Sequence, residues 1–286
     1  MKGGLMLISI FKNQVAKITF WAFPIIILGC QSNKTDKAHQ VNGANSIAKD
    51  TMTYEMRTIK EISPYIAEHE DQLDTSYAEV TYPIFQDSNL NTLVQSTILI
   101  DGEPNIQTYA YNFIEGYGNF IEENDLNYPI AWTKTTKVNI SLYSPELICI
   151  KNATYEFSGG AHGNSFENIS VFELENFRKL ALNSFISDNK MKEFTKIAEN
   201  IFRKTENLSD TSSLERDYFF EDGKFALSAN YGITKNGIMF HYNPYEIKPY
   251  AAGTTTIVVP FSEIKDLMTE TGKLYVRNLQ EYFQSI

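Results

Sequence analysis

The chain has 286 residues, of which 43% are hydrophobic, and a formal charge of −10. This length and apolar content suffice for a core of one or two small domains. So acidic a chain is a poor match for nucleic acid or an anionic lipid surface, and it favours cationic partners.

Residues 1–29 have the layout of a cleaved signal peptide. They contain three lysines and no acid, and an apolar run over residues 18–28 is interrupted by Pro24. This run is shorter than the roughly 20 apolar residues that a membrane-spanning helix needs, so the sequence predicts cleavage and not a stable span. Cleavage removes the three lysines and no acid, which changes the charge from −10 to −13.

The segment Ile27-Leu28-Gly29-Cys30 resembles a lipobox, in which a small residue precedes a cysteine that receives a diacylglycerol. We therefore expect lipidation at Cys30 and attachment to a bacterial membrane in the cell envelope, facing the periplasm or the outside. Residues 30–52 contain no aromatic side chain and little apolar surface, which predicts a flexible tether. The alternative is a plain secretory signal with an incidental cysteine.

Beyond the tether, β-branched and aromatic runs predict strands, and apolar residues at helical spacing predict helices. The expected strands cover residues 54–62, 77–85, 138–143, 147–157, 166–174, 238–242 and 255–259. The expected helices cover residues 87–98, 105–121 and 189–204, followed by a last helix that Ser262 caps and that contains Ile264 and Leu267.

Strands and helices are clustered along the chain and do not alternate strictly. This order indicates an α+β fold with antiparallel sheets, packed helices and two related or adjoining subdomains. We place an N-terminal subdomain at residues 53–157 and a C-terminal subdomain at residues 158–286. Cys149 lies in an apolar run and has no intramolecular partner once Cys30 is lipidated, so no disulfide is expected. A buried small side chain is the preferred interpretation of Cys149, and a reactive thiol is the alternative.

Several motifs together resemble one known family. The block Gly159-Gly160-Ala161-His162-Gly163 is followed by Tyr245-Glu246-Ile247-Lys248-Pro249-Tyr250-Ala251-Ala252-Gly253, and Tyr82-Pro83-Ile84-Phe85 and Phe172-Glu173-Leu174 support them. Over about residues 54–267 the chain resembles the extracytoplasmic domain found in RsiV-type anti-sigma factors and in PdaC-type peptidoglycan deacetylases.

The chain departs from the family pattern at two places. Asn176-Phe177 stands where a Thr-Gly turn is usual, and Lys248 stands where an alanine is usual. We expect Asn176-Phe177 to form a different turn. We expect Lys248 to change the charge of the segment that meets a partner. The resemblance implies a sensor or binding domain, with a lysozyme-type muramidase as the partner, and no deacetylase or cytoplasmic anti-sigma segment is expected in this chain.

Two loops carry the candidate binding residues. The glycines around His162 would let the backbone approach a ligand, and the imidazole could act as a base or metal ligand; the alternative is a demanding turn between strands. Residues 242–250 hold two prolines and three tyrosines, and stiff tyrosine-rich loops suit protein recognition, although the tyrosines could instead cover a sheet edge. The candidate binding residues are His162, Tyr242, Tyr245, Glu246 and Tyr250.

No catalytic motif of a hydrolase, zinc protease, nucleotide-binding protein or dehydrogenase occurs in the sequence. The one conceivable zinc set, His162, His241 and Glu246, lacks any fixed local spacing, so neither a metal nor a cofactor is predicted. The sequence therefore favours a lipid-anchored envelope protein that binds a cationic lysozyme-like protein or another cell-wall component. A peptidoglycan-acting enzyme that uses His162 and a structural lipoprotein without a soluble ligand stay open as alternatives.

Overall fold

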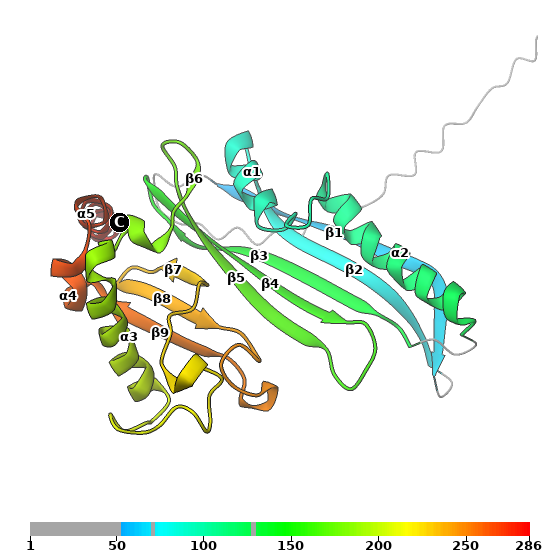
Figure 1. Cartoon of the computed structure of the whole chain (residues 1–286). Helices are drawn as coiled ribbons and strands as arrows, with labels where there is room; N and C mark the ends of the chain where they lie inside the picture. The colour runs from blue at the N-terminus through cyan, green and yellow to red at the C-terminus, as the bar shows by residue number, and fades with distance from the viewer. Residues whose placement is uncertain (1–52, 70–71, 127–129) are drawn as a thin grey trace, which may run out of the picture. The chain divides into compact units, whose positions relative to one another are not determined.

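A computed structural model describes residues 53–69, 72–126 and 130–286 (Figure 1). The predicted signal peptide, Cys30 and the predicted tether lie outside these residues. Within the described part, strands form one six-stranded sheet in the order β1-β2-β3-β4-β5-β6 and one three-stranded sheet in the order β7-β8-β9. Helices pack on both sheets, so the α+β prediction is confirmed.

The larger sheet is mixed. Its strands are β1 (Tyr54–His69), β2 (Gln72–Phe85), β3 (Thr133–Tyr143), β4 (Leu147–Phe157), β5 (Asn164–Glu173) and β6 (Arg178–Lys179). Neighbours are antiparallel except β2 and β3, which pair in parallel because a long connection with two helices joins them. The smaller sheet is antiparallel throughout and consists of β7 (Tyr231–Ile233), β8 (Gly237–Tyr242) and β9 (Thr255–Pro260).

Two helices lie in the β2–β3 connection, and both begin where the sequence predicts. In α1 (Ser88–Ser96) the Asp87 side chain accepts a hydrogen bond from the Asn89 amide, and in α2 (Ile106–Asn124) Asn105 accepts one from the Thr108 amide. Helix α2 packs on β1 and β2. Gly118 permits this approach, because a Cβ atom there would lie 3.3 Å from the Tyr65 ring.

The remaining helices follow the larger sheet in sequence. They are α3 (Met191–Thr205), α4 (Phe261–Ile264) and α5 (Glu270–Ser285). Short 3-10 turns occupy Leu182–Ser184, Asp188–Lys190, Glu221–Gly223, Tyr250–Ala252 and Lys265–Leu267. The predicted helix 189–204 matches α3. Pro260, and not Ser262, occupies the N-cap position of α4, and the long α5 was not predicted.

Strand β4 explains how one sheet serves two cores. Ile148 and Ile150 point to the face that α1 and α2 cover, whereas Leu147 and Cys149 point to the opposite face, which packs with α3 and the smaller sheet. All four side chains are buried, which is why the strand reads as a continuous apolar run. The second core is rich in aromatic residues, among them Phe194, Phe202, Phe240 and Tyr242.

Strands β1, β2 and β3 are longer than the sequence predicts, since β2 begins at Gln72 and β3 at Thr133. Strand β1 continues beyond Ile62 through Pro64, with a register shift between Ile62 and Ile66. A proline is tolerated there because β1 is an edge strand, and its missing N–H breaks no ladder. The predicted subdomain boundary between residues 157 and 158 falls within the hairpin that joins β4 to β5.

Candidate functional site

The two loops singled out in the sequence meet in space. The His162 ring stacks on the Tyr250 ring with centroids 4.1 Å apart and planes 14° apart, and the Tyr245 and Tyr250 centroids lie 5.5 Å apart. The Tyr250 hydroxyl donates a hydrogen bond to the Gly163 carbonyl at 3.1 Å. We call this surface, formed by His162, Tyr245 and Tyr250, the aromatic triad. Its members come from segments about 80 residues apart in the chain.

The glycine-rich loop between β4 and β5 needs its glycines. Gly159 and Gly160 have φ angles of +94° and +93°, a region that other residues rarely occupy. Gly163 is required for a different reason, because a Cβ atom there would lie 2.3 Å from the Tyr155 hydroxyl. His162 is therefore held over a turn whose backbone few other sequences could form, and its Nδ1 lies 2.9 Å from the Gly163 carbonyl oxygen.

The second loop places Tyr245 in a strained backbone conformation. Its φ angle is +66°, which is uncommon for a bulky side chain, and its side chain is 54% exposed. The Glu246 carboxylate holds this turn, since it accepts hydrogen bonds from the Asn243 amide at 2.8 Å and from the Ser228 hydroxyl at 2.7 Å. Glu246 thus stabilises the turn that contains Tyr245.

Lys248 does not add charge to the exposed surface, contrary to the expectation from the sequence. It is 8% exposed, and its ammonium lies 3.0 Å from Glu206 Oε1. Glu206 also accepts hydrogen bonds from Thr255 and Tyr218. Burial alone would raise the pKa of Glu206, but these three donors outweigh it and hold that pKa below its ordinary value. Burial, and next the hydrogen bond to the Glu206 carboxylate, raise the pKa of Tyr218.

Tyr242 belongs to the core and not to the exposed part of this loop. It is 1% exposed, and its hydroxyl donates to the Ala226 carbonyl at 2.8 Å. Burial raises the pKa of Tyr242. The reason is strand alternation, because Tyr242 follows Ile238 and Phe240 on the buried face of β8. The structure therefore brings His162, Tyr245 and Tyr250 together at the surface and leaves Tyr242 in the core, against Phe202, Phe220 and Phe225.

The conceivable zinc set is not assembled. His162 contacts Tyr245 and Tyr250, whereas His241 Nδ1 lies 2.8 Å from the Thr256 hydroxyl, and Glu246 is engaged within its loop. In the part of the chain that the structure describes, no group of three or more His, Cys, Asp or Glu side chains is arranged to hold a metal ion. Cys149 is buried, which raises the pKa of its thiol, so its prediction as a buried side chain is confirmed.

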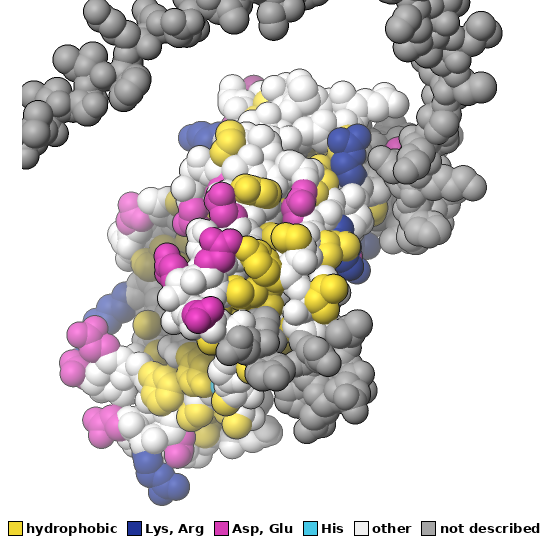
Figure 2. Space-filling model, turned by 90° about the vertical axis from the view of Figure 1, so that its right-hand side faces the viewer, with side chains coloured by type: hydrophobic (Ala, Val, Ile, Leu, Met, Phe, Trp, Pro, Cys, Tyr) yellow, Lys and Arg dark blue, Asp and Glu magenta, His cyan; other side chains and the backbone are white. Residues whose placement is uncertain are grey.

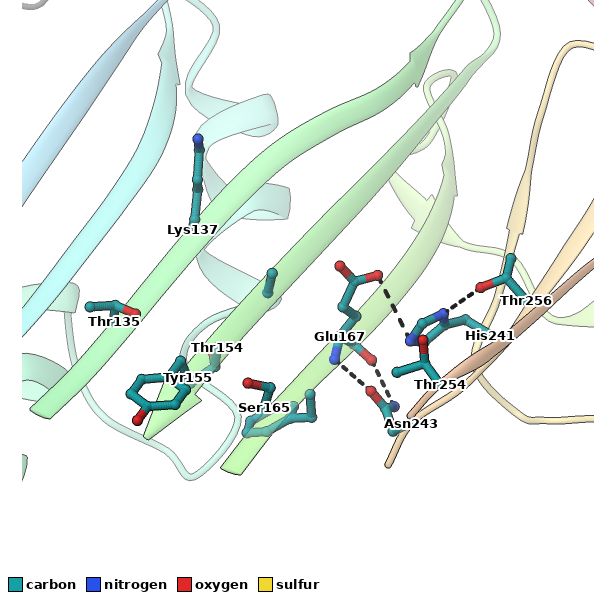
Figure 3. Close-up of a pocket in the computed structure, with 12 residues that line it drawn as sticks. Thr135, Lys137, Thr154, Tyr155, Ser165, Glu167, His241, Asn243, Thr254 and Thr256 are labelled. Carbon is teal, nitrogen blue, oxygen red and sulfur yellow. Dashed lines mark hydrogen bonds and ion pairs between the residues drawn. The ribbon is translucent and has the colours of Figure 1, made fainter. Parts of the chain in front are cut away.

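A polar groove that the sequence did not reveal lies beside the smaller sheet (Figure 3). It has a volume of about 580 Å³, and its lining includes Lys137, Tyr155, Glu167, His241 and Asn243. Asn243 pairs with the backbone of Glu167, accepting from its N–H at 2.6 Å and donating to its carbonyl at 3.0 Å. These residues come from four strands of two sheets and from the loop after β8, so no local sequence signal marks the groove.

Large apolar side chains are exposed elsewhere on the molecule. Ile62 and Ile66 of β1 are 56% and 59% exposed, and Phe120 of α2 is 40% exposed. Figure 2 shows hydrophobic side chains gathered on one face of the molecule with acidic side chains beside them. None of the sequence-predicted site residues lies on β1 or α2. A search of the described residues finds no helix with the length and apolar character needed to cross a membrane.

Two family models match the chain. Residues 66–165 match the model described as deacetylase PdaC, and residues 183–262 match the model described as protein of unknown function DUF3298. No curated protein matches.

Solved structures show the same fold. A DUF3298 family member from Bacteroides fragilis is 21% identical with a TM-score of 0.65, and the match covers 82% of this chain and 100% of that one. A DUF3298 family protein from Pseudomonas aeruginosa is 16% identical with a TM-score of 0.60, over 78% of this chain and 96% of that one. At these identities the likeness concerns the fold alone.

Proposed function

We propose that this chain is a lipid-anchored, non-catalytic binding protein of the cell envelope. It carries a PdaC-type region followed by a DUF3298 region, which is the domain type that its motifs predicted. Its recognition surface is the aromatic triad. Its partner is a cationic protein of the lysozyme class, as the resemblance implies.

The observation that carries this proposal is the conformation of Tyr245. A bulky residue with positive φ costs stability, and such residues persist where the surrounding structure enforces them, often at ligand-binding surfaces. Here the strain presents a 54% exposed ring beside Tyr250 and His162. Phe177, the other aromatic residue with positive φ among the described residues, packs partly buried against a hydrophobic core, whereas Tyr245 belongs to neither core.

The loop around Tyr245 is rigid before any partner arrives. Ile247 is 4% exposed, and its carbonyl accepts a hydrogen bond from the Phe219 amide at 2.9 Å. Lys248 pairs with Glu206 beneath the surface. Little conformational entropy is then lost on binding, which favours affinity for a given contact area.

Charge supports a cationic partner. The mature chain would have a charge of −13, which speeds encounter with a basic protein and weakens as salt is added. Attraction of this kind is not specific, so we assign specificity to the aromatic triad and only the encounter rate to charge. Membrane attachment through Cys30 would keep the domain in the envelope, where such a partner acts on the cell wall.

The geometry of His162 favours binding over catalysis. Its ring is stacked on Tyr250, one nitrogen faces a backbone carbonyl, and Nε2 lies 3.5 Å from the Tyr245 hydroxyl. These contacts of His162 include no carboxylate that could orient it as a base and no nucleophile that it could activate. The triad is therefore read as a contact surface.

Calorimetric titration of the full chain with a c-type lysozyme at 0.1 M and 1 M NaCl tests the proposal. The Debye length falls from about 10 Å to about 3 Å over this range, so we expect a specific complex to persist at 1 M. Tyr245→Ala should weaken it by about thirtyfold, the equivalent of about 2 kcal/mol for a central aromatic contact. Tyr111→Ala is the matched control, because Tyr111 of α2 is 50% exposed and lies outside the triad.

A second variant separates binding from folding. Asparagine tolerates positive φ, so Tyr245→Asn should fold at least as stably as the wild type and still lose binding. Binding that disappears at 1 M NaCl contradicts recognition by the triad. So does an equal loss of affinity in Tyr245→Ala and in the control Tyr111→Ala. Absence of binding at either salt concentration would favour the structural lipoprotein.

A further inference from the structure

The groove beside the smaller sheet has a floor built from three adjacent strands. Ala153 of β4 pairs with Lys137 of β3 on one side and with Glu167 of β5 on the other. A small side chain between two long ones leaves a hollow, and the next residue on this face of β4, Tyr155, closes one end of it. Across two strand spacings the two charged residues are about 10 Å apart at the backbone, which leaves room for one sugar ring with an acidic substituent between them.

Glu167 is held firmly at its side of the hollow. Its backbone N–H and carbonyl pair with Asn243, and Asn230 donates a further hydrogen bond to the same carbonyl at 2.7 Å. One carboxylate oxygen of Glu167 accepts from Lys151 at 2.9 Å. The other, Oε2, lies 3.8 Å from His241 Nε2, beyond hydrogen-bond distance. Glu167 therefore presents an oriented carboxylate oxygen to the groove (Figure 3).

His241 supplies a second polar group that the fold leaves unpaired. It is 5% exposed, its Nδ1 is engaged by Thr256, and Nε2 has no hydrogen-bond partner among the described residues. Unpaired buried nitrogens are rare in folded proteins. Burial lowers the pKa of His241, which keeps the imidazole neutral at neutral pH. Nε2 has almost no accessible surface, so the neutral imidazole does not itself meet a ligand; the adjacent Glu167 carboxylate can accept a hydrogen bond from a ligand hydroxyl, and it repels an anion.

The opposite side of the hollow has different chemistry. Lys137 is exposed, and among the described residues no carboxylate lies within 4 Å of its ammonium, unlike Lys151, which pairs with Glu167. An unpaired lysine suits an anionic group of a ligand. Between the two sides, the Tyr155 ring is 40% exposed and offers an apolar surface on which the C–H face of a sugar ring can pack.

We infer that this groove binds a saccharide that carries a carboxylate. The hydroxyl groups lie against the Glu167 carboxylate, the sugar ring lies on Tyr155, and the acidic substituent pairs with Lys137. This site adjoins the aromatic triad, since Tyr155 packs beside Gly163, but it shares no residue with the triad and does not depend on the proposed protein partner.

Ligand-observed NMR titration of the full chain tests this inference with three probes. They are N-acetylmuramic acid, N-acetylglucosamine, which lacks the carboxylate, and lactate, which lacks the sugar. We expect the acidic sugar to bind at least tenfold more tightly than the neutral one, and lactate not to bind. Lys137→Met should remove this preference and leave the neutral sugar unchanged, whereas Lys192→Met, at an exposed position on α3, should change neither.

Filling the hollow provides an independent arm. Ala153→Phe should abolish binding of both sugars while thermal unfolding and lysozyme titration stay as in the wild type. The inference is overturned if neither sugar binds the wild-type chain. Equal binding of lactate and the acidic sugar, or an equal loss of both sugars in Lys137→Met, also overturns it. Lysozyme binding is measured in parallel, so failure of the groove and failure of the triad are distinguishable.

Discussion

The side chain of Asn243 pairs with both backbone polar groups of Glu167, as a neighbouring strand would. This contact links the loop after β8 to β5 across the two sheets. Asn243→Ala leaves the Glu167 N–H without its partner, and we expect the free energy of unfolding to fall by about 1–3 kcal/mol. Urea denaturation measures the change, with Asn200→Ala on the exposed surface of α3 as the control.

Hydrogen exchange gives a direct readout of the same contact. The Glu167 amide should exchange faster in Asn243→Ala, while amides in the centre of β4 keep their protection. Unchanged exchange at Glu167 would show that the asparagine does not hold this strand.

The glycine at 163 should not tolerate a methyl group. A Cβ atom there would lie 2.3–2.4 Å from three atoms of the Tyr155 side chain, so Gly163→Ala must displace that ring. Because the contacting atoms are the outer end of a 40% exposed side chain, we expect a loss at the low end of overpacking, about 1 kcal/mol by thermal or urea unfolding. Adding Tyr155→Ala should restore part of the loss.

Gly116→Ala is the matched control for that substitution. Gly116 lies inside α2, has open space around its Cβ position and needs no positive φ. Alanine should therefore stabilise the helix by about 0.5–1 kcal/mol. Equal destabilisation by the two glycine variants would contradict the steric explanation for Gly163.

Glu206 should make stability depend on acid. Its folded-state pKa lies below the ordinary value of 4.5, so its stabilising contribution is complete above pH 4.5 and is lost as the pH falls through the lower folded-state pKa. Urea unfolding at pH 7 and pH 3 should show that the free energy of unfolding falls less on acidification in Glu206→Gln than in the wild type. A wild-type slope that persists in the variant would assign the acid sensitivity to other groups.

Lys248 and Glu206 should be coupled. Lys248→Met leaves a largely buried carboxylate without its cation, and we expect a cost of about 3 kcal/mol at pH 7. The double variant Glu206→Gln with Lys248→Met should recover part of this cost, which a double-mutant cycle measures. Additive effects would indicate that the pair does not interact.

Attachment to the membrane through Cys30 is tested by Cys30→Ser. The variant should lose labelling by a fatty-acid analogue and appear unprocessed or in the soluble fraction. Cys149→Ser is the control, because a buried thiol should not be acylated. Labelling that persists in Cys30→Ser would refute the lipoprotein proposal.

Local signals predicted local structure well. The Asn105 cap and the apolar spacing that follows it gave α2, and the alternation around Val138 to Leu142 gave β3. The two loop motifs were correctly identified as candidates, and His162 and Tyr250 do meet. The same alternation could have placed Tyr242 in the core, because it continues the buried face of Ile238 and Phe240.

Features that depend on distant pairs could not be read from the sequence. Asn243 and Glu167 are 76 residues apart, and nothing near either residue indicates their contact. Lys248 looked like a surface charge because its partner, Glu206, lies 42 residues away at the end of α3. The groove was missed for the same physical reason, since side chains from separate strands form it only after the sheets have packed.

The bridging asparagines also bear on how the molecule avoids joining to its own copies. Strand β6 pairs only with the last two residues of β5, so most of that side of β5 has no neighbouring strand within residues 53–69, 72–126 and 130–286. There Asn230 and Asn243 occupy the Glu167 N–H and carbonyl and the Ile169 N–H, and Leu180 donates to the Val171 carbonyl. A bare row of such groups would act as a template for intermolecular β-pairing. The side-chain amides of Asn230 and Asn243, which flank strands of the second sheet, therefore protect this edge from intermolecular pairing.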